Sequence, residues 1–266
     1  MDLLNVDTFV QPKTWEEVPA WQPGWAWLAG GTWLFSEPQP NLKTLVDLNQ
    51  FGWSELEVSS RGIIIGATCP MVKLLELETS ADWPGVSILK QAVHELASFK
   101  VQGSATVVGN ICLALPASTF APVMVLLGAQ YEILSPDGGS RWIPAQAFQT
   151  AARHTLLRPG EVMRRIHIPP DWLSWQADYR RLCLASAGIA VTIVVAARNP
   201  VTAALRYAIG GAIPAPILLE IAATDEVESA LEAAIAPTTW LNNVTGSAPY
   251  RRAMTAVLMR RCAHTL

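Results

Sequence analysis

The sequence predicts a mixed chain of strands and helices in two domains, and three patterns support this. Two apolar stretches flank the turn Ser59-Ser60-Arg61-Gly62, which is typical of a β-hairpin. Between Val86 and Ala97, apolar residues recur at helical spacing, which predicts an amphipathic helix. Pro169-Pro170-Asp171 then breaks a strand pattern, so we predict domains over residues 1–171 and 172–266.

Within the first domain, local signals predict a series of short elements. They are a short helix capped by Thr14, a buried strand over 25–29 that ends in Gly30-Gly31, and a helix that starts near Pro70 with Thr68 as its cap. There follow a polar loop over 100–110, a short helix over 120–127, a hairpin that turns at 136–139 and a strand over 161–168.

The predicted second domain begins with three strands, over 178–184, 192–196 and 204–209, and ends with two helices. The last helix is expected to run from Ser247, whose hydroxyl can cap its first turn, to about Arg261. Arginines at its end suit the negative end of the helix dipole.

Composition argues against several classes of protein. Hydrophobic residues make up 51% of the 266, but the longest apolar run, Gly188 to Ala197, is too short to span a bilayer. A net charge of −3 without a Lys/Arg-rich stripe argues against a nucleic-acid partner. The acidic N-terminus is unlike a secretory signal, so we expect a cytoplasmic protein. Only 15% of residues are charged, which fits either one large core or a subunit with an extensive interface.

Neither cysteine nor histidine spacing predicts a metal site in this chain. Cys69, Cys112, Cys183 and Cys262 form no Cys-x-x-Cys pair, and the four histidines are equally scattered. We therefore expect free thiols and assign any metal to a partner chain.

Two glycine-bearing loops are the candidate functional features. Gly30-Gly31-Thr32 can be a plain turn, or a cradle whose main-chain N–H groups bind a diphosphate. The loop from Gly103 to Asn110 is open to the same two interpretations. Neither loop is a Rossmann fingerprint or a P-loop, because the defining glycine and lysine spacings are absent. A long dinucleotide such as FAD would need two such sets of donors.

Six motifs in a fixed order include these loops. They are Ala29-Gly30-Gly31-Thr32-Trp33-Leu34, Leu45-Val46-Asp47-Leu48, Ile65-Gly66-Ala67, Ala105-Thr106-Val107-Val108-Gly109-Asn110, Pro116-Ala117-Ser118-Thr119 and the stretch from Leu205 to Pro216. In order and spacing they resemble the FAD-binding medium subunits of molybdopterin dehydrogenases, the xanthine and carbon monoxide dehydrogenase family. The resemblance extends over almost the whole chain.

The resemblance implies a fold and a role. The fold would be α+β: an FAD-binding domain of the vanillyl-alcohol-oxidase type, with two α+β subdomains, followed by a smaller α+β C-terminal domain. The chain would be the oxidoreductase subunit that carries FAD. In such complexes a large molybdopterin subunit hydroxylates the substrate, and a small iron–sulfur subunit with [2Fe–2S] clusters carries the electrons. The flavin passes them to NAD⁺, oxygen or another acceptor.

The same resemblance implies which residues hold FAD. They are Ala29, Gly30, Gly31, Thr32, Trp33 and Leu34 in the first loop, Thr106, Val108, Gly109 and Asn110 in the second, and Thr119 near the ribityl chain. Arg180 falls where relatives place a cation near the flavin, although a surface arginine is an equal interpretation. No residue is predicted to be a catalytic acid or base, because the flavin itself carries the redox step.

The sequence departs from the family pattern at three of these positions. Trp33 and Thr119 each stand where the family has Asp, and Val108 stands where it has Gly. A β-branched residue resists positive φ and brings a side chain toward the space of a phosphate, so weaker FAD binding is expected. Two alternatives stay open: a flavin-free scaffold subunit of the same kind of complex, and a stand-alone flavoprotein with a diffusible electron donor.

Overall fold

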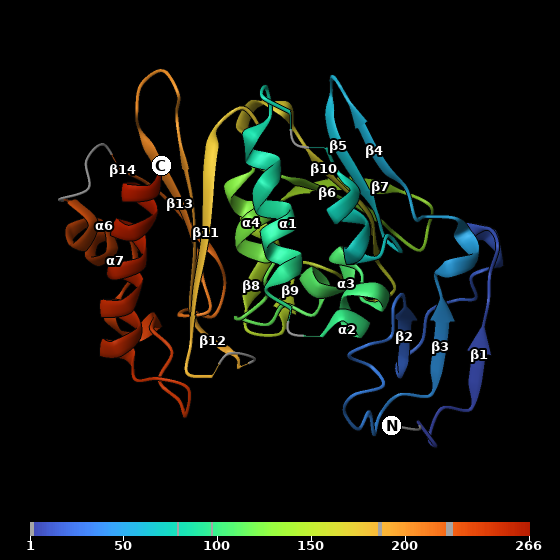
Figure 1. Ribbon diagram of the computed structural model, residues 1–266. Helices are drawn as coiled ribbons and strands as arrows, with labels where there is room; N and C mark the ends of the chain where they lie inside the picture. The colour runs from blue at the N-terminus through green and yellow to red at the C-terminus, as the bar shows by residue number, and fades with distance from the viewer. Residues whose placement is uncertain (1–2, 79, 97, 186–187, 222–225) are drawn as a thin grey trace.

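Three main β-sheets, with helices between and beside them, organise the chain (Figure 1). The computed structural model describes residues 3–78, 80–96, 98–185, 188–221 and 226–266. The strands are β1 (Thr8–Val10), β2 (Trp25–Leu28), β3 (Thr44–Asp47), β4 (Leu56–Ser59), β5 (Gly62–Gly66), β6 (Gln130–Leu134), β7 (Ser140–Pro144), β8 (Gln149–Ala151), β9 (His154–Thr155), β10 (Val162–Ile168), β11 (Gln176–Cys183), β12 (Ala190–Arg198), β13 (Leu205–Gly210) and β14 (Ile217–Ile221).

The helices are short except for the last. The α-helices are α1 (Ser87–His94), α2 (Phe99–Ser104), α3 (Val107–Cys112), α4 (Ala121–Leu126), α5 (Ala145–Phe148), α6 (Val227–Ala234) and α7 (Ala248–Thr265). The 3₁₀ turns are η1 (Trp15–Glu17), η2 (Asn49–Phe51), η3 (Met71–Glu76), η4 (Pro84–Val86), η5 (Pro170–Trp172) and η7 (Pro237–Thr239).

Each main sheet is built from neighbouring segments of the chain, and the longest connection brings β10 back into the second sheet. In the first sheet, β1 and β2 both pair in parallel with the central strand β3. The second sheet is antiparallel, in the order β4-β5-β10-β6-β7, so β10 returns to the middle of a sheet whose other strands come from two hairpins. The third is the antiparallel meander β11-β12-β13-β14, and β8 and β9 form a small separate pair.

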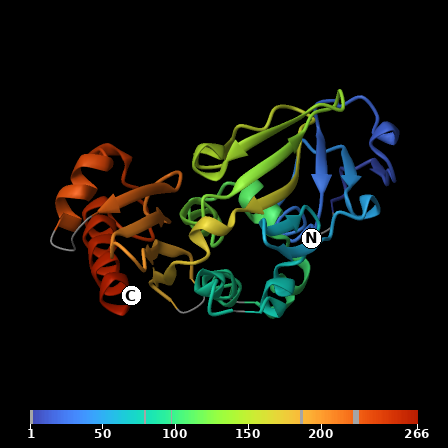
Figure 2. The ribbon, with the colours of Figure 1, turned by 90° about the horizontal axis from the view of Figure 1, so that it is seen from above.

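The longest apolar run of the sequence forms most of the central strand β12, and helices cover both of its faces. Val194 and Ile209 pack with residues of α6 and α7, whereas Val195 and Ala208 join the main core on the side of α1 and α4. Figure 2 shows this C-terminal sheet with α6 and α7 as one lobe and the rest of the chain as the other. A strand buried on both faces needs a continuous apolar run, which explains the run from Gly188 to Ala197. In the part of the chain that the structure describes, no helix is long and apolar enough to cross a membrane.

A buried arginine fixes α7 to the C-terminal sheet. Arg251 is 1% exposed, and its guanidinium donates to the carbonyl oxygens of Val191, Gly211 (2.9 Å) and Gly246 (3.3 Å). It also donates to the side chains of Asn243 (2.8 Å) and Thr245. All five acceptors are neutral, so carbonyl and hydroxyl dipoles compensate the buried charge. As predicted, Ser247 caps this helix by accepting from the N–H of Tyr250 at 3.3 Å.

Stacked tryptophans join the first sheet to the second. Trp27 of β2 lies between Trp15 and Trp21, with ring centroids 5.7 and 4.7 Å away, and Trp15 continues the stack to Trp53 at 6.3 Å. The indole N–H of Trp27 donates to the carbonyl oxygen of Glu161 at 3.1 Å. Aromatic pairs at these distances add about 0.5–1.5 kcal/mol each beyond the area that they bury.

The Glu161 carboxylate has a lowered pKa. Burial alone would raise it, but hydrogen bonds from Arg141 (2.7 Å), the N–H of Arg158 (2.8 Å) and Ser135 (3.3 Å) outweigh burial and hold the pKa below its ordinary value of 4.5. The ionised form is thus favoured in the folded protein. Its contribution to stability is full above pH 4.5 and is lost as the pH falls through the lowered pKa.

This predicts how Glu161→Gln changes the dependence of stability on pH. The variant should be less stable than the parent at pH 7, and the difference in free energy of unfolding should shrink as the pH falls below 4.5, where the parent loses the charge. Urea denaturation of both proteins between pH 7 and pH 3 measures this. A difference that stays constant over that range would contradict the ion-pair account.

Several local predictions are wrong, and the reasons are local. Residues 100–110 are not a loop: they form α2 and α3, because Thr106 caps α3 by accepting from the N–H of Gly109 at 2.9 Å. Thr68 caps no helix, since η3 begins at Met71 and Pro70 precedes it without a side-chain cap. Thr14 precedes η1, also without a cap hydrogen bond. The helix predicted to reach Ala97 ends at His94 as α1, and Ala97 lies outside the described residues.

Candidate functional site: a cofactor groove

A groove of about 590 Å³ lies between the loop that follows β2 and the segment that contains α3. Small-molecule and cofactor sites occupy roughly 300–1,000 Å³. One wall is formed by residues 29–34 and Ser36, and the other by residues between Ala105 and Thr119, including α3. Figure 1 shows α2 and α3 beside the end of β2. The groove thus brings together the two loops that the sequence singled out.

The first wall presents backbone donors. Within the described part of the chain, the N–H groups of residues 30–34 have no hydrogen-bond partner. Gly31 has φ +67°, a left-handed conformation that glycine adopts without strain. Gly30 lies directly against the backbone of Ser104, so that a Cβ at this position would meet the Ser104 carbonyl oxygen. Glycines are therefore required here by geometry: one by its φ, the other by the close approach of the two walls.

The second wall contains α3, and the helical conformation of this segment keeps the side chain of Val108 out of the groove. Thr106, Gly109 and Asn110 line the groove, as the sequence predicted. Val108 does not line it: its side chain is 4% exposed and packs in the main core, and its φ is not positive because it lies within a helix. A β-branched residue is tolerated in that conformation, so Val108 neither strains the loop nor fills the groove.

Two buried polar atoms in the groove wall lack partners. They are the indole Nε1 of Trp33 and the hydroxyl of Thr119, neither of which has a hydrogen bond in the described part of the chain. Orphaned buried polar groups are rare in folded proteins and mark places that a ligand or water completes. The indole N–H of Trp33 and the hydroxyl of Thr119 therefore fit a ligand that is rich in hydrogen-bonding oxygens. Outside the groove, the guanidinium of Arg153 lies 5.4 Å from the centre of the Trp33 ring and 3.9 Å from the carboxylate of Glu37.

The groove holds no charged side chain among the described residues that line it. Its titratable lining residue is Cys112, and burial raises the pKa of that thiol to about 12, so it stays protonated. All four cysteines are free, as predicted. Within the described ranges, no group of three or more His, Cys, Asp or Glu could hold a metal. Among the described lining residues, the groove therefore presents hydrogen-bonding groups and apolar side chains rather than an ionised acid or base.

Arg180 is not part of the groove, which corrects its predicted role. Its guanidinium donates to the Asp178 carboxylate and to the Thr265 hydroxyl of α7, each at 2.6 Å, and these contacts hold it on the α7 side of β11. The hydrogen bond that Arg180 donates to Asp178 raises the pKa of the guanidinium above its ordinary value. Alternation along β11 explains the error, because Arg181, its neighbour, faces the opposite way and pairs with Glu95 after α1.

Sequence reasoning missed the apolar part of the groove. Trp27, Met71, Leu96 and Val101 line it from four separate segments. No local pattern distinguishes such residues from ordinary core residues, because their meeting depends on the tertiary fold. Ser118 also lines the groove. It belongs to the motif Pro116-Ala117-Ser118-Thr119, of which only Thr119 was predicted to contact the cofactor.

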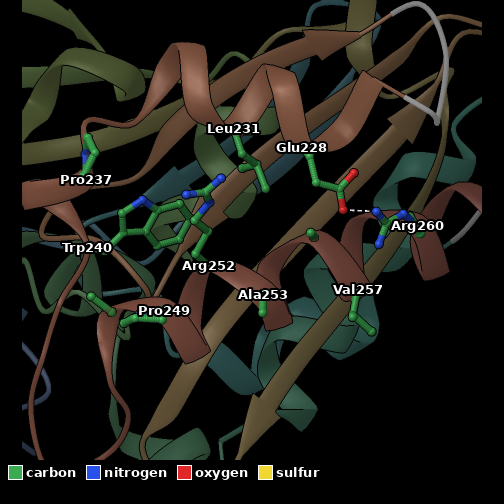
Figure 3. A pocket seen from close by; sticks show the side chains of 11 residues that line it. Glu228, Leu231, Pro237, Trp240, Pro249, Arg252, Ala253, Val257 and Arg260 are labelled. Atoms are coloured by element: carbon green, nitrogen blue, oxygen red, sulfur yellow. Dashed lines mark hydrogen bonds and ion pairs between the residues drawn. The ribbon is translucent and has the colours of Figure 1, made fainter.

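A second hollow, of about 570 Å³, lies between α6 and α7 on the C-terminal lobe (Figure 3). Leu231 and Trp240 line it, and Figure 3 shows Glu228 of α6 and Arg260 of α7 pointing toward each other across it. Arg252 pairs in the same way with Glu232. These charges satisfy one another, and none of the predicted site residues lies there.

The groove combines hydrogen-bonding groups with apolar side chains and has no charged lining residue among the described ones, which suits a nucleotide-type cofactor. The profile of the family "FAD binding domain in molybdopterin dehydrogenase" matches residues 6–171, and the chain belongs to this family. The predicted family and the predicted cofactor, FAD, are thereby confirmed. The chain is 26% identical, over 82% of its length, to the carbon monoxide dehydrogenase medium chain of Afipia carboxidovorans, and covers 79% of that protein.

Longer relatives contain a similar segment. A xanthine dehydrogenase of Oryza sativa is 30% identical over 43% of this chain, and the match spans 9% of the rice protein. Among solved structures, a chain of a Cu,Mo-CO dehydrogenase in its cyanide-inactivated form superposes with a TM-score of 0.86 at 22% identity, covering 99% of this chain and 98% of the other. At 22% identity this structural similarity supports a shared fold and nothing more specific.

Proposed function

We propose that this chain is the electron-transfer subunit of a molybdenum hydroxylase complex and holds FAD in the groove. The observation that carries the proposal is the pairing of two donor-bearing walls without any charged side chain, in a chain of this FAD-binding family. Main-chain N–H groups concentrate positive potential and can bind a diphosphate without cations.

The proposed residue roles follow from position. The N–H groups of residues 30–34 would hold the diphosphate, with Asn110 as a side-chain donor from the opposite wall. Trp27 and Leu96 would exclude water from the apolar part of the cofactor. Bound FAD would supply the electron transfer, and this chain's residues would bind and orient it.

Partners and acceptor are also proposed. A small iron–sulfur subunit would deliver electrons that a large molybdopterin subunit extracts from the substrate, and NAD⁺, oxygen or another acceptor would receive them. The similarity to a carbon monoxide dehydrogenase medium chain supports this assembly. We further propose a vanillyl-alcohol-oxidase-type arrangement for residues 1–171 and a separate C-terminal domain from residue 172.

The test is the visible absorption spectrum of the purified chain, followed by chromatography of any released cofactor and titration of the stripped protein with FAD and with FMN. We expect one FAD per chain and a clear preference for FAD, because FMN lacks the diphosphate. A colourless protein that takes up neither flavin would overturn the proposal. It would favour the flavin-free scaffold subunit, for which copurification with iron–sulfur and molybdopterin chains is the corresponding test.

A further inference from the structure

The amide of Asn110 is held in one orientation. Its Oδ1 accepts from the Ser118 hydroxyl at 2.6 Å and from the backbone N–H of Phe120 at 3.4 Å. A backbone N–H can only donate, so the atom that faces it must be the amide oxygen and not the nitrogen. The Nδ2 group therefore lies on the other branch of the side chain, and in the described part of the chain it has no partner.

Ser118 is committed to this arrangement. It is 2% exposed, and its hydroxyl accepts from the N–H of Ala121 at 3.1 Å while donating its single hydrogen to Asn110. The hydroxyl thus has no second hydrogen for a ligand. Ser118 can influence a bound molecule only through the orientation of Asn110 or through the start of α4.

We infer that Ser118 is a positioning residue, which turns the Nδ2 group of Asn110 into the groove as a fixed donor for a diphosphate oxygen of FAD. The inference rests on the proposed function. Asn110 is opposite a wall whose N–H groups at 30–34 also lack partners, and no charged side chain lines the groove among the described residues. A diphosphate there must be held by neutral donors, and an amide that could rotate freely would present its oxygen half of the time.

The test is a double-mutant cycle on the full chain, with Ser118→Ala, Asn110→Ala and the two combined. Dissociation constants are measured by fluorescence titration of the stripped protein with FAD and riboflavin, and by competition with ADP, which carries the diphosphate without the flavin. Ser118→Ala should weaken FAD about tenfold in the parent and less than about twofold in the Asn110→Ala background. ADP should show the same pattern, and riboflavin should bind all variants alike.

A second variant covers the case in which Ser118→Ala fails to fold. Asn110→Asp keeps an oxygen for Ser118 and Phe120 but replaces Nδ2 by a negatively charged oxygen, so it should bind FAD more weakly than Asn110→Ala does. Equal or tighter binding would overturn the inference. So would a Ser118→Ala effect that persists without Asn110, which would place the role in α4, or an effect on riboflavin but not on ADP. If the parent protein binds no FAD, the proposed function fails and the inference with it.

Discussion

Replacement of Arg251 by methionine is expected to lower the free energy of unfolding by about 3–5 kcal/mol. Methionine fills much of the same space, but it removes the guanidinium donor from five acceptors, of which the carbonyl oxygens of Val191 and Gly211 take part in fully buried hydrogen bonds. These acceptors belong to the start of β12, the end of β13 and the loop before α7, so one substitution loosens all three junctions at once. Urea denaturation at neutral pH, followed by circular dichroism, measures the loss.

The neighbouring residue provides a matched control. Arg252 has a side chain that is 42% exposed and pairs with Glu232 at the surface. Exposed ion pairs contribute about 0–1 kcal/mol, so Arg252→Met should change stability by less than about 1 kcal/mol. If both variants lost the same amount, the buried network would not be the cause. Because domains are typically stable by roughly 5–15 kcal/mol, a loss of about 3–5 kcal/mol for Arg251→Met is a large fraction of the total and should shift the urea midpoint clearly.

Elements whose patterns are local were predictable from the sequence. The hairpin of β4 and β5 has its turn residues and its alternation within one short stretch, and Ser247 caps α7 in the expected way. The parallel sheet was not predictable, because β1 and β3 are short and meet only through tertiary contacts. The segment 100–110 was misjudged because Gly103 suggested a loop, whereas the Thr106 cap and the buried Val107 and Ile111 favour helix.

The site was predictable where its residues lie within short sequence motifs, including the lining residues Trp33, Asn110 and Thr119. The glycine turn and the segment from Ala105 to Asn110 lie in recognisable motifs, and the structure brings both to the same groove. The predictions for Val108 and Arg180 depended on the direction in which each side chain points, and the surrounding fold determines that direction. At position 108 the helix turns the side chain into the core, and at position 180 the partners Asp178 and Thr265 hold it away from the groove.

Gly30→Ala is expected to raise the dissociation constant for FAD by about ten- to a hundredfold, because overpacking against rigid backbone costs about 1–3 kcal/mol. A Cβ at residue 30 would meet the carbonyl oxygen of Ser104, and neither atom belongs to a flexible side chain. The two walls must then move apart, which separates the donors of residues 30–34 from Asn110. Fluorescence titration of the stripped protein with FAD, and urea denaturation without it, measure the two consequences.

Gly103→Ala is the matched control, since it makes the same chemical change one residue before Ser104. No atom lies within 4 Å of a Cβ built at Gly103, and the residue is exposed within α2. Alanine in a helix is favoured over glycine by up to about 1 kcal/mol, so this variant should bind FAD normally and be slightly more stable. If Gly30→Ala bound FAD as tightly as Gly103→Ala, the close approach of the walls would not matter for the cofactor. The glycine turn would then be a structural turn, and the diphosphate would have to be sought elsewhere in the groove.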